Sequence, residues 1–172
     1  MTHAFPLVSR TAAATELCEL AGQLAEELMD PVVDEYERNA LYPEGLFAKI
    51  GELGLLGLPF DEEIGGAGVS YEVYLQVLEE VARHWASVAV ALSVHTMSTM
   101  AVVRHGSSEQ KAQLLPGLLE RRTIAGYSLS EPQAGSDVAA LACRAQRDED
   151  LYRITGEKAW ITHGGRARQL AS

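Results

Sequence analysis

The fold of this 172-residue chain is decided around the stretch Tyr127-Ser128-Leu129-Ser130-Glu131-Pro132-Gln133-Ala134-Gly135-Ser136-Asp137. Its first residues fit a strand, and those from Pro132 onward are turn formers, so we predict a strand that runs into a turn. These residues alone leave two interpretations open. The stretch is a plain connection, or its backbone N–H groups and the hydroxyls of Ser130 and Ser136 bind an anionic or acceptor-rich ligand. In the second case Gly135 would let the ligand approach the backbone closely.

A second candidate segment reads Lys158-Ala159-Trp160-Ile161-Thr162-His163-Gly164-Gly165. Its residues predict a strand over 158–162 that ends at the glycines. Alternation along a strand places Trp160 and Thr162 on one side, where an indole face and a hydroxyl are suited to hold a planar heterocycle. The other interpretation is a strand with one large aromatic residue in the core.

The chain before these segments predicts helices. Apolar residues recur with helical spacing over 11–39, in a helix that Pro31 should kink or interrupt. Each further helix should begin at or near a residue that favours helix starts, and the expected starts are Pro43, Ser70, about Ala86 and Ser107. The last of these helices should break near Pro116.

After Arg122 the pattern changes from helices to strands. The expected strands are 123–129, 139–147, 151–155 and 158–162, with an acidic turn at 148–150. We therefore predict an N-terminal α-helical domain over 1–122 and an incomplete middle β-domain over 123–172. The fold class is mainly α with a partial β-domain: an N-terminal helical bundle followed by the first strands of a β-barrel-like domain. About fifty residues are few for a β-domain and leave unpaired edges, so we expect the chain to be incomplete.

Composition excludes several classes of function. With 14 basic and 24 acidic side chains the formal charge is −10, so nucleic acid is not expected as a partner. Cys18 and Cys143 belong to no CxxC pair or His cluster, so neither a metal site nor a disulfide is expected. Residues 1–6 lack the pattern of a signal peptide, which favours a cytoplasmic location. The stretch 85–103 has no charged side chain but several polar ones, and it fits a helix buried in a bundle better than a membrane span.

Together these segments resemble the acyl-CoA dehydrogenase family, whose members bind FAD. The run Tyr-x-x-Ser-Glu-Pro-x-Ala-Gly-Ser-Asp over 127–137 resembles the family's flavin-binding signature. Residues 158–162 resemble its second flavin-contacting strand. The segments 58–68 and 106–111 resemble the loop between its second and third helices and the start of its fifth helix. Four matching segments thus follow one another in the order of the family.

The resemblance implies contacts with the FAD cofactor for six residues, which are Tyr127, Leu129, Ser130, Trp160, Ile161 and Thr162. The first three would meet the isoalloxazine ring through backbone and side-chain donors. The indole would pack on the flavin, and the two residues after it would lie near the reactive edge. Family members commonly have Thr where Ser130 stands, so the hydroxyl is kept without the β-branch that restricts its rotamer.

The resemblance also implies an acyl-CoA substrate, which the family dehydrogenates at the α,β carbons with hydride transfer to the flavin. Ser136 would hydrogen-bond the CoA portion, and Ser93, Thr96 and Met97 would line the acyl pocket. Full-length relatives are expected to be homotetramers that pass electrons to electron-transfer flavoprotein.

One part of the family pattern has no counterpart in the sequence. The C-terminal helical domain, which usually supplies the catalytic Glu, is absent, so we assign no catalytic residue to this chain. Glu131 should belong to the turn, and His95 and His105 should be packed or solvated. The chain is then a fragment, a pseudo-enzyme with a shifted frame after Arg166, or a true short subunit. A non-catalytic interaction module and a related acyl-CoA oxidase or flavin monooxygenase remain alternative functions.

Overall fold

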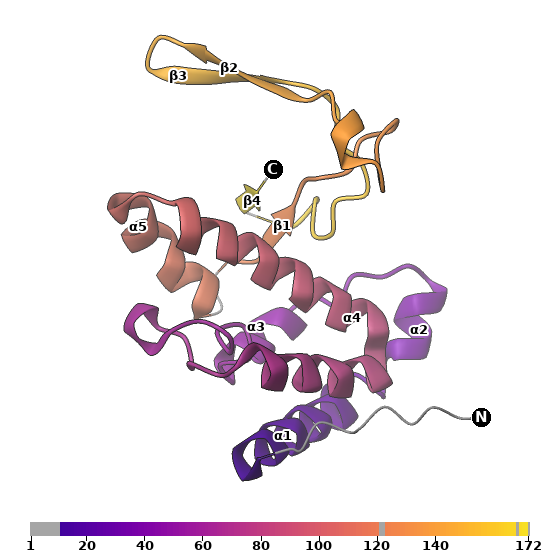
Figure 1. Ribbon diagram of the computed structural model, residues 1–172. Coiled ribbons are helices and arrows are strands. Elements are labelled where there is room, and N and C mark those ends of the chain that lie inside the picture. Colours follow the sequence, from indigo (N-terminus) through magenta and orange to yellow (C-terminus); the bar gives the residue numbers. More distant parts are fainter. Residues whose placement is uncertain (1–10, 121–122, 168, 172) are drawn as a thin grey trace, which may run out of the picture.

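The computed structural model describes residues 11–120, 123–167 and 169–171, and it shows a helical body with a small β-part above it (Figure 1). The helices are α1 (Ala12–Leu28), α2 (Val33–Arg38), α3 (Leu46–Glu52), α4 (Tyr71–His105) and α5 (Ser108–Leu119), with 3-10 turns η1 (Glu62–Ile64) and η2 (Val138–Ala140). The strands are β1 (Ala125–Tyr127), β2 (Arg144–Asp148), β3 (Leu151–Thr155) and β4 (Gln169–Ala171). This order confirms the predicted fold class, mainly α with a partial β-domain.

The N-terminal helical segment is interrupted as predicted. α1 begins at the N-cap Thr11, whose hydroxyl accepts from the Ala14 N–H at 3.2 Å. It ends at Leu28, three residues before Pro31, and α2 follows. Proline has no N–H to donate and clashes with the preceding turn, so a helix does not continue through this position.

The two helices that were predicted from Ser70 and from about Ala86 form α4, and a kink at Trp85 lies at the boundary expected between them. Ser70 caps α4 as expected, and the chain leaves helical geometry only at Trp85, with φ −149° and ψ 94°. The buried Trp85 indole donates to the Glu37 carboxylate at 2.5 Å. Neither proline nor glycine causes this kink, so we attribute it to the tie between Trp85 and α2.

The buried residues of α4 itself form the centre of the molecule. It packs against α1 on one side and against α5 and β1 on another. Within the described residues it is the one helix long and apolar enough to cross a membrane, and 44% of its most apolar window is buried. One such helix argues little for a membrane span, because core helices of soluble proteins share this length and composition.

α5 confirms the capping box but not the predicted break. The Ser107 hydroxyl accepts from the Gln110 N–H at 3.2 Å, and the Gln110 side chain accepts from the Ser107 N–H at 2.8 Å. The helix nevertheless continues through Pro116 to Leu119, so the predicted break is wrong. Leu115, Leu118 and Leu119 are buried, and this packing outweighs the loss of one helical hydrogen bond in the last turn.

Ser107→Ala should destabilise the chain by about 1 kcal/mol, because an N-cap hydroxyl satisfies an otherwise orphaned N–H group. Urea unfolding followed by circular dichroism would measure the change. Ser108→Ala is the matched control, because Ser108 is exposed and lies inside the first turn. Equal stability of both variants would contradict the role of the cap.

The expected helix start at Pro43 is wrong by one turn. α3 begins at Leu46, after Gly45 in the left-handed region with φ +79°. The loop that follows α3 is closely packed at Gly66, where an added Cβ would lie 2.0 Å from the Phe60 carbonyl oxygen. The glycine-rich composition of this loop therefore has a structural reason in the packing of the helical body.

The β-part consists of two separate pairs of strands. β1 pairs in parallel with β4, with Ala125 opposite Gln169 and Tyr127 opposite Ala171. β2 and β3 form an antiparallel hairpin that turns at residues 149–150, within the acidic turn that was predicted, and extends away from the helices (Figure 1). Every residue of this hairpin is exposed.

Three predicted strands need correction. The strand expected over 123–129 forms pairs only over Ala125–Tyr127. The strand expected over 139–147 begins at Arg144, because the preceding residues form η2 and a loop. Residues 158–162 form no strand, since Trp160 takes a left-handed backbone conformation with φ +59°.

Candidate functional site

The buried carboxylate of Glu131 organises the turn after β1. It accepts from the N–H groups of Ala142 at 2.7 Å and Cys143 at 2.9 Å, and from the Gln133 amide at 2.6 Å. The Lys158 ammonium adds a hydrogen bond at 2.9 Å. These donors lower the pKa of Glu131 to about 2, with the Ala142 N–H the largest cause and Lys158 the next. Glu131 is therefore a structural anion within the turn, as predicted.

The same contacts bring the two candidate segments together. Lys158 also donates to the Leu129 carbonyl at 2.8 Å, and the Ala159 N–H donates to the Ser130 carbonyl at 2.9 Å. Residues 129–130 and 158–159, which lie 29 positions apart in the sequence, are thus joined by hydrogen bonds. Sequence reasoning did not identify Lys158 as part of the site, although a cation inside an otherwise apolar segment signals a buried acidic partner.

Trp160 is the most unusual residue of this region. Its side chain is 93% exposed, and its backbone is left-handed with φ +59°. An L-residue with a bulky side chain rarely adopts this conformation, and such strain collects at functional sites. Because the indole has so little contact with the rest of the chain, its flat face is available to a ligand.

Three hydroxyl side chains of the two candidate segments are also available. The hydroxyls of Ser130 and Thr162, both in half-buried residues, have no hydrogen-bond partner within the described part of the chain. Ser136 is exposed, and its hydroxyl likewise has no partner there. A Cβ added to Gly135 would meet nothing within 4 Å, so packing does not require a glycine at this position. These features fit a site that is open to an acceptor-rich ring system.

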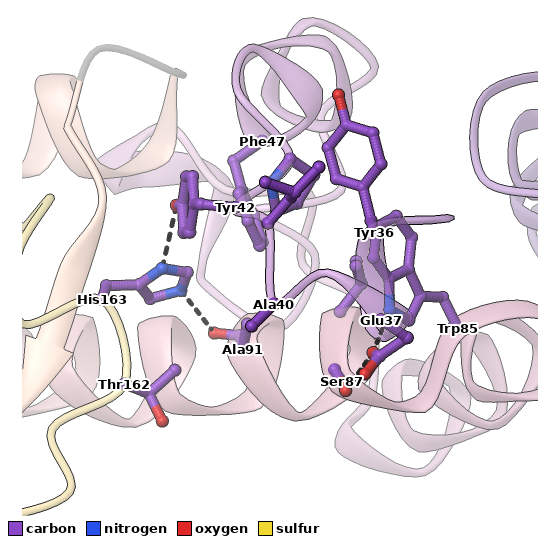
Figure 2. A pocket seen from close by; sticks show the side chains of 13 residues that line it. Tyr36, Glu37, Ala40, Tyr42, Phe47, Trp85, Ser87, Ala91, Thr162 and His163 are labelled. Carbon is purple, nitrogen blue, oxygen red and sulfur yellow. Dashed lines mark hydrogen bonds between the residues drawn. The ribbon is translucent and has the colours of Figure 1, made fainter. Parts of the chain in front are cut away.

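A cavity of about 270 Å³ lies next to Thr162, between the α2–α3 connection and α4 (Figure 2). Glu37 lies in its wall and accepts from the Ser87 hydroxyl at 2.6 Å as well as from Trp85. These hydrogen bonds, with that of Ser87 the stronger cause, lower the pKa of Glu37. Because both donors use the same oxygen and favour the ionised form, Glu37 is poorly suited to take up a proton.

Two family models match the chain. The model of the acyl-CoA dehydrogenase N-terminal domain matches residues 11–122, and that of the acyl-CoA dehydrogenase middle domain matches residues 126–171. The chain belongs to the acyl-CoA dehydrogenase family. The second match continues past Arg166 to residue 171 and so includes β4, which pairs with β1.

Members of this family with different acyl substrates resemble the chain to a similar degree. Isovaleryl-CoA dehydrogenase from Solanum tuberosum is 35% identical over 155 residues, which cover 88% of this chain and 38% of the relative. The structure of butyryl-CoA dehydrogenase from Megasphaera elsdenii is 29% identical with a TM-score of 0.85, and the match covers 94% of this chain and 43% of that one. The chain thus spans about two fifths of the length of these acyl-CoA dehydrogenases.

A third match comes from a structure that concerns electron transfer. A chain in the structure of the electron transferring flavoprotein of Acidaminococcus fermentans is 28% identical, with a TM-score of 0.87. The match covers 94% of this chain and 43% of that chain.

The three residues predicted to line an acyl-CoA dehydrogenase's acyl pocket do not share one environment here. Ser93 and Met97 lie one helical turn apart on α4, and Met97 is 46% exposed. Thr96 is buried and accepts from the Tyr74 hydroxyl at 2.9 Å. The structure therefore places Thr96 in the helical core. The exposed Val90, seven residues before Met97, is a better member of the face that carries the other two, and helical periodicity would have found it.

The two histidines discussed from the sequence are placed as predicted. His95 is fully buried and hydrogen-bonded at both ring nitrogens, whereas His105 is exposed at the end of α4. Within the described residues no group of three His, Cys, Asp or Glu side chains is arranged to hold a metal ion.

Proposed function

We propose that this chain forms the flavin-facing and acyl-facing surfaces of an FAD-dependent acyl-CoA dehydrogenase. The observation that supports the proposal is the pair of hydrogen bonds from Lys158 and Ala159 to the carbonyls of Leu129 and Ser130, which joins the first candidate segment to the segment that carries the exposed Trp160. Bound FAD would supply the hydride acceptor for α,β-dehydrogenation of an acyl-CoA.

The residues of this chain would bind and orient the reactants. The hydroxyls of Ser130 and Thr162 would donate to the flavin ring, and the indole of Trp160 would cover part of it. Ser136 would hydrogen-bond the CoA portion of the substrate. Donors that are already fixed before the reaction cost little reorganisation when negative charge develops, which is how such a surface assists the reaction.

We place the base that removes the substrate's α-proton outside the described residues. Glu131 holds four donors and Glu37 holds two, and both have lowered pKa values, so neither is suited to accept a proton near neutral pH. The 172-residue chain alone should therefore bind the reactants without turning them over.

Anaerobic mixing tests whether the chain binds FAD and acyl-CoA without removing the α-proton of the substrate. The FAD-loaded chain would be mixed with isovaleryl-CoA, butyryl-CoA and glutaryl-CoA while the flavin absorbance is followed. We expect binding-induced spectral shifts without bleaching. Bleaching at enzymatic rates would show that the chain carries its own base, whereas absence of any FAD binding would contradict the proposed function itself.

Trp160→Ala should weaken FAD binding by up to about tenfold, because an aromatic contact contributes on the order of 1 kcal/mol beyond its buried area. It should leave thermal stability unchanged, since the side chain is 93% exposed. Flavin fluorescence titration measures the affinity. Tyr152→Ala is the matched control, because Tyr152 is also an exposed aromatic residue but lies on the β2–β3 hairpin. Equal affinities of the two variants would argue against a flavin at Trp160.

Two partners belong to the proposal. Electron-transfer flavoprotein is the proposed electron acceptor, supported by the similarity to a chain in the Acidaminococcus structure. A homotetramer is the proposed assembly of full-length relatives, and it rests on the family alone.

A non-catalytic interaction module is the second candidate function. The observation that favours it is the β2–β3 hairpin, where Leu151, Tyr152 and Ile154 are 75%, 68% and 66% exposed. Exposed apolar residues on a two-stranded hairpin with open outer edges favour association with another chain. A micromolar or tighter FAD affinity of the wild-type chain would argue against this alternative.

A further inference from the structure

His163 directly follows the proposed flavin-contacting residues, and it is packed tightly against the helical body. Its side chain lies beside Tyr42 and above α4 (Figure 2), and it is only 7% exposed. One ring nitrogen, Nδ1, is 3.0 Å from the Tyr42 hydroxyl, and the other, Nε2, is 3.3 Å from the Ala91 carbonyl oxygen. Phe47 makes an edge contact with the ring at a centroid distance of 4.8 Å.

These contacts define the protonation of the ring. A carbonyl oxygen can only accept, so Nε2 carries the hydrogen and donates to Ala91. Burial lowers the pKa of His163 and so favours the neutral ring, in which Nδ1 accepts from the Tyr42 O–H group. The neutral His163 therefore uses both ring nitrogens to join three parts of the chain: its own loop, the α2–α3 connection and α4.

The backbone of His163 is itself held in an unfavourable conformation. Its φ is +64°, in the left-handed region that residues with a Cβ seldom occupy. Such a conformation persists only where the surroundings fix it. The two hydrogen bonds and the ring contact supply that constraint, and the left-handed Trp160 lies three residues earlier.

A second contact ties the same loop to the same connection. Arg166 donates to the Glu44 carboxylate at 2.6 Å, and its guanidinium lies 5.3 Å from the centre of the Tyr42 ring. On the other side of the segment, Ala159 is fixed by its bond to the Ser130 carbonyl. Residues 160–162 thus lie between two fixed ends, with Trp160 exposed and Ile161 and Thr162 half-buried.

Both proposed flavin-facing segments are hydrogen-bonded to α4. His95 lies one helical turn after Ala91, and its Nδ1 accepts from the Ala125 N–H at the start of β1 at 3.0 Å. Both segments are therefore attached to neighbouring turns of one rigid helix. A shift of the 160–162 segment relative to β1 would require the His163 contacts to break.

We propose that His163 is a positioning residue, which fixes the Trp160–Thr162 segment against α4 and so sets the distance between the two halves of the flavin site. The inference rests on the proposed function, because it assigns His163 a task toward FAD. It predicts an effect on local order as well as an effect on affinity, and the two are measured separately.

The test compares His163→Leu, which removes both hydrogen bonds, with His163→Gln, which keeps a donor and an acceptor. FAD affinity should fall about tenfold in His163→Leu, as expected for the loss of net hydrogen-bond energy, and should recover at least in part in His163→Gln. Tyr42→Phe, which removes one of the two bonds, should lie between wild type and His163→Leu. His105→Leu is the control, because His105 is exposed.

Limited trypsin digestion reports on the segment without FAD. In His163→Leu, cleavage after Arg166 should become several-fold faster relative to cleavage after Arg83 inside α4. An unchanged ratio would overturn the proposal, and so would equal acceleration at both sites, which indicates general unfolding. If the wild-type chain binds no FAD, the proposed function fails, and the cleavage ratio still decides whether His163 orders the segment.

Discussion

Glu131→Gln should reduce FAD affinity by more than about tenfold, because charge-assisted hydrogen bonds are about twice as strong as neutral ones and several meet at this carboxylate. The carboxylate joins the turn after β1 to residues 142–143 and to Lys158. The amide group of the introduced glutamine would point an N–H donor at groups that are themselves hydrogen-bond donors. It would also leave Lys158, whose side chain is 16% exposed, without its anionic partner. Both flavin-facing segments would lose the contact that aligns them.

The same substitution should change the response to acid. The donors around Glu131 lower its pKa from 4.5 to about 2, so the folded chain releases this proton more readily than the unfolded chain. The resulting stability is fully present above pH 4.5 and is lost as the pH falls toward 2. Melting temperatures measured between pH 5 and pH 2 should fall less steeply in Glu131→Gln than in wild type. Glu157→Gln is the control, because Glu157 is exposed in the same region. Identical pH profiles for both variants would contradict the assigned role.

The second large expected effect is a dependence of folding stability on the protonation of His95, at a higher pH than that of Glu131. His95 accepts from the Ala125 N–H and donates to the Leu118 carbonyl at 2.9 Å, which joins α4 to β1 and to the end of α5. Burial is the main cause that lowers the pKa of His95 to about 4. The unfolded chain, with a pKa of 6.5 at this side chain, therefore binds a proton in a range where the folded chain does not. Stability is fully present above pH 6.5 and declines as the pH falls to 4, by about 3 kcal/mol at most.

His95→Leu should remove this pH dependence and lower stability at neutral pH. The Ala125 N–H and the Leu118 carbonyl would both be left buried without partners, at a cost of about 3 kcal/mol for the pair. Urea unfolding at pH 7.5, 5.5 and 4.5 measures both effects, with His105→Leu as the control. A wild-type stability that stays constant from pH 7.5 to pH 4.5 would contradict the buried neutral state of His95.

Local sequence signals predicted the elements whose causes are themselves local. The capping residues Ser70 and Ser107 and the interruption at Pro31 act within a few residues of the backbone they affect. The turn around Glu131 was likewise visible from its composition. Each of these signals depends on the chemistry of neighbouring residues, which the sequence contains directly.

The features that were missed depend on contacts between distant residues. The helix boundary expected near Ala86 agrees with the kink at Trp85, but the hydrogen bond from Trp85 to Glu37, on another helix, was not predicted. Alternation predicted a strand over 158–162, but the segment is fixed by Ser130 at one end and by His163 at the other, which leaves Trp160 in a left-handed conformation. The place of Thr96 in the acyl pocket was implied by the family resemblance, and its hydrogen bond from Tyr74 could not be seen without the fold.

Hydrogen exchange with and without FAD tests the central claim most directly. The account predicts that FAD slows amide exchange in residues 127–130 and 159–163 together, while exchange in the exposed β2–β3 hairpin is unchanged. Protection of only one segment, or protection confined to residues outside both, would contradict a flavin site formed by their contact.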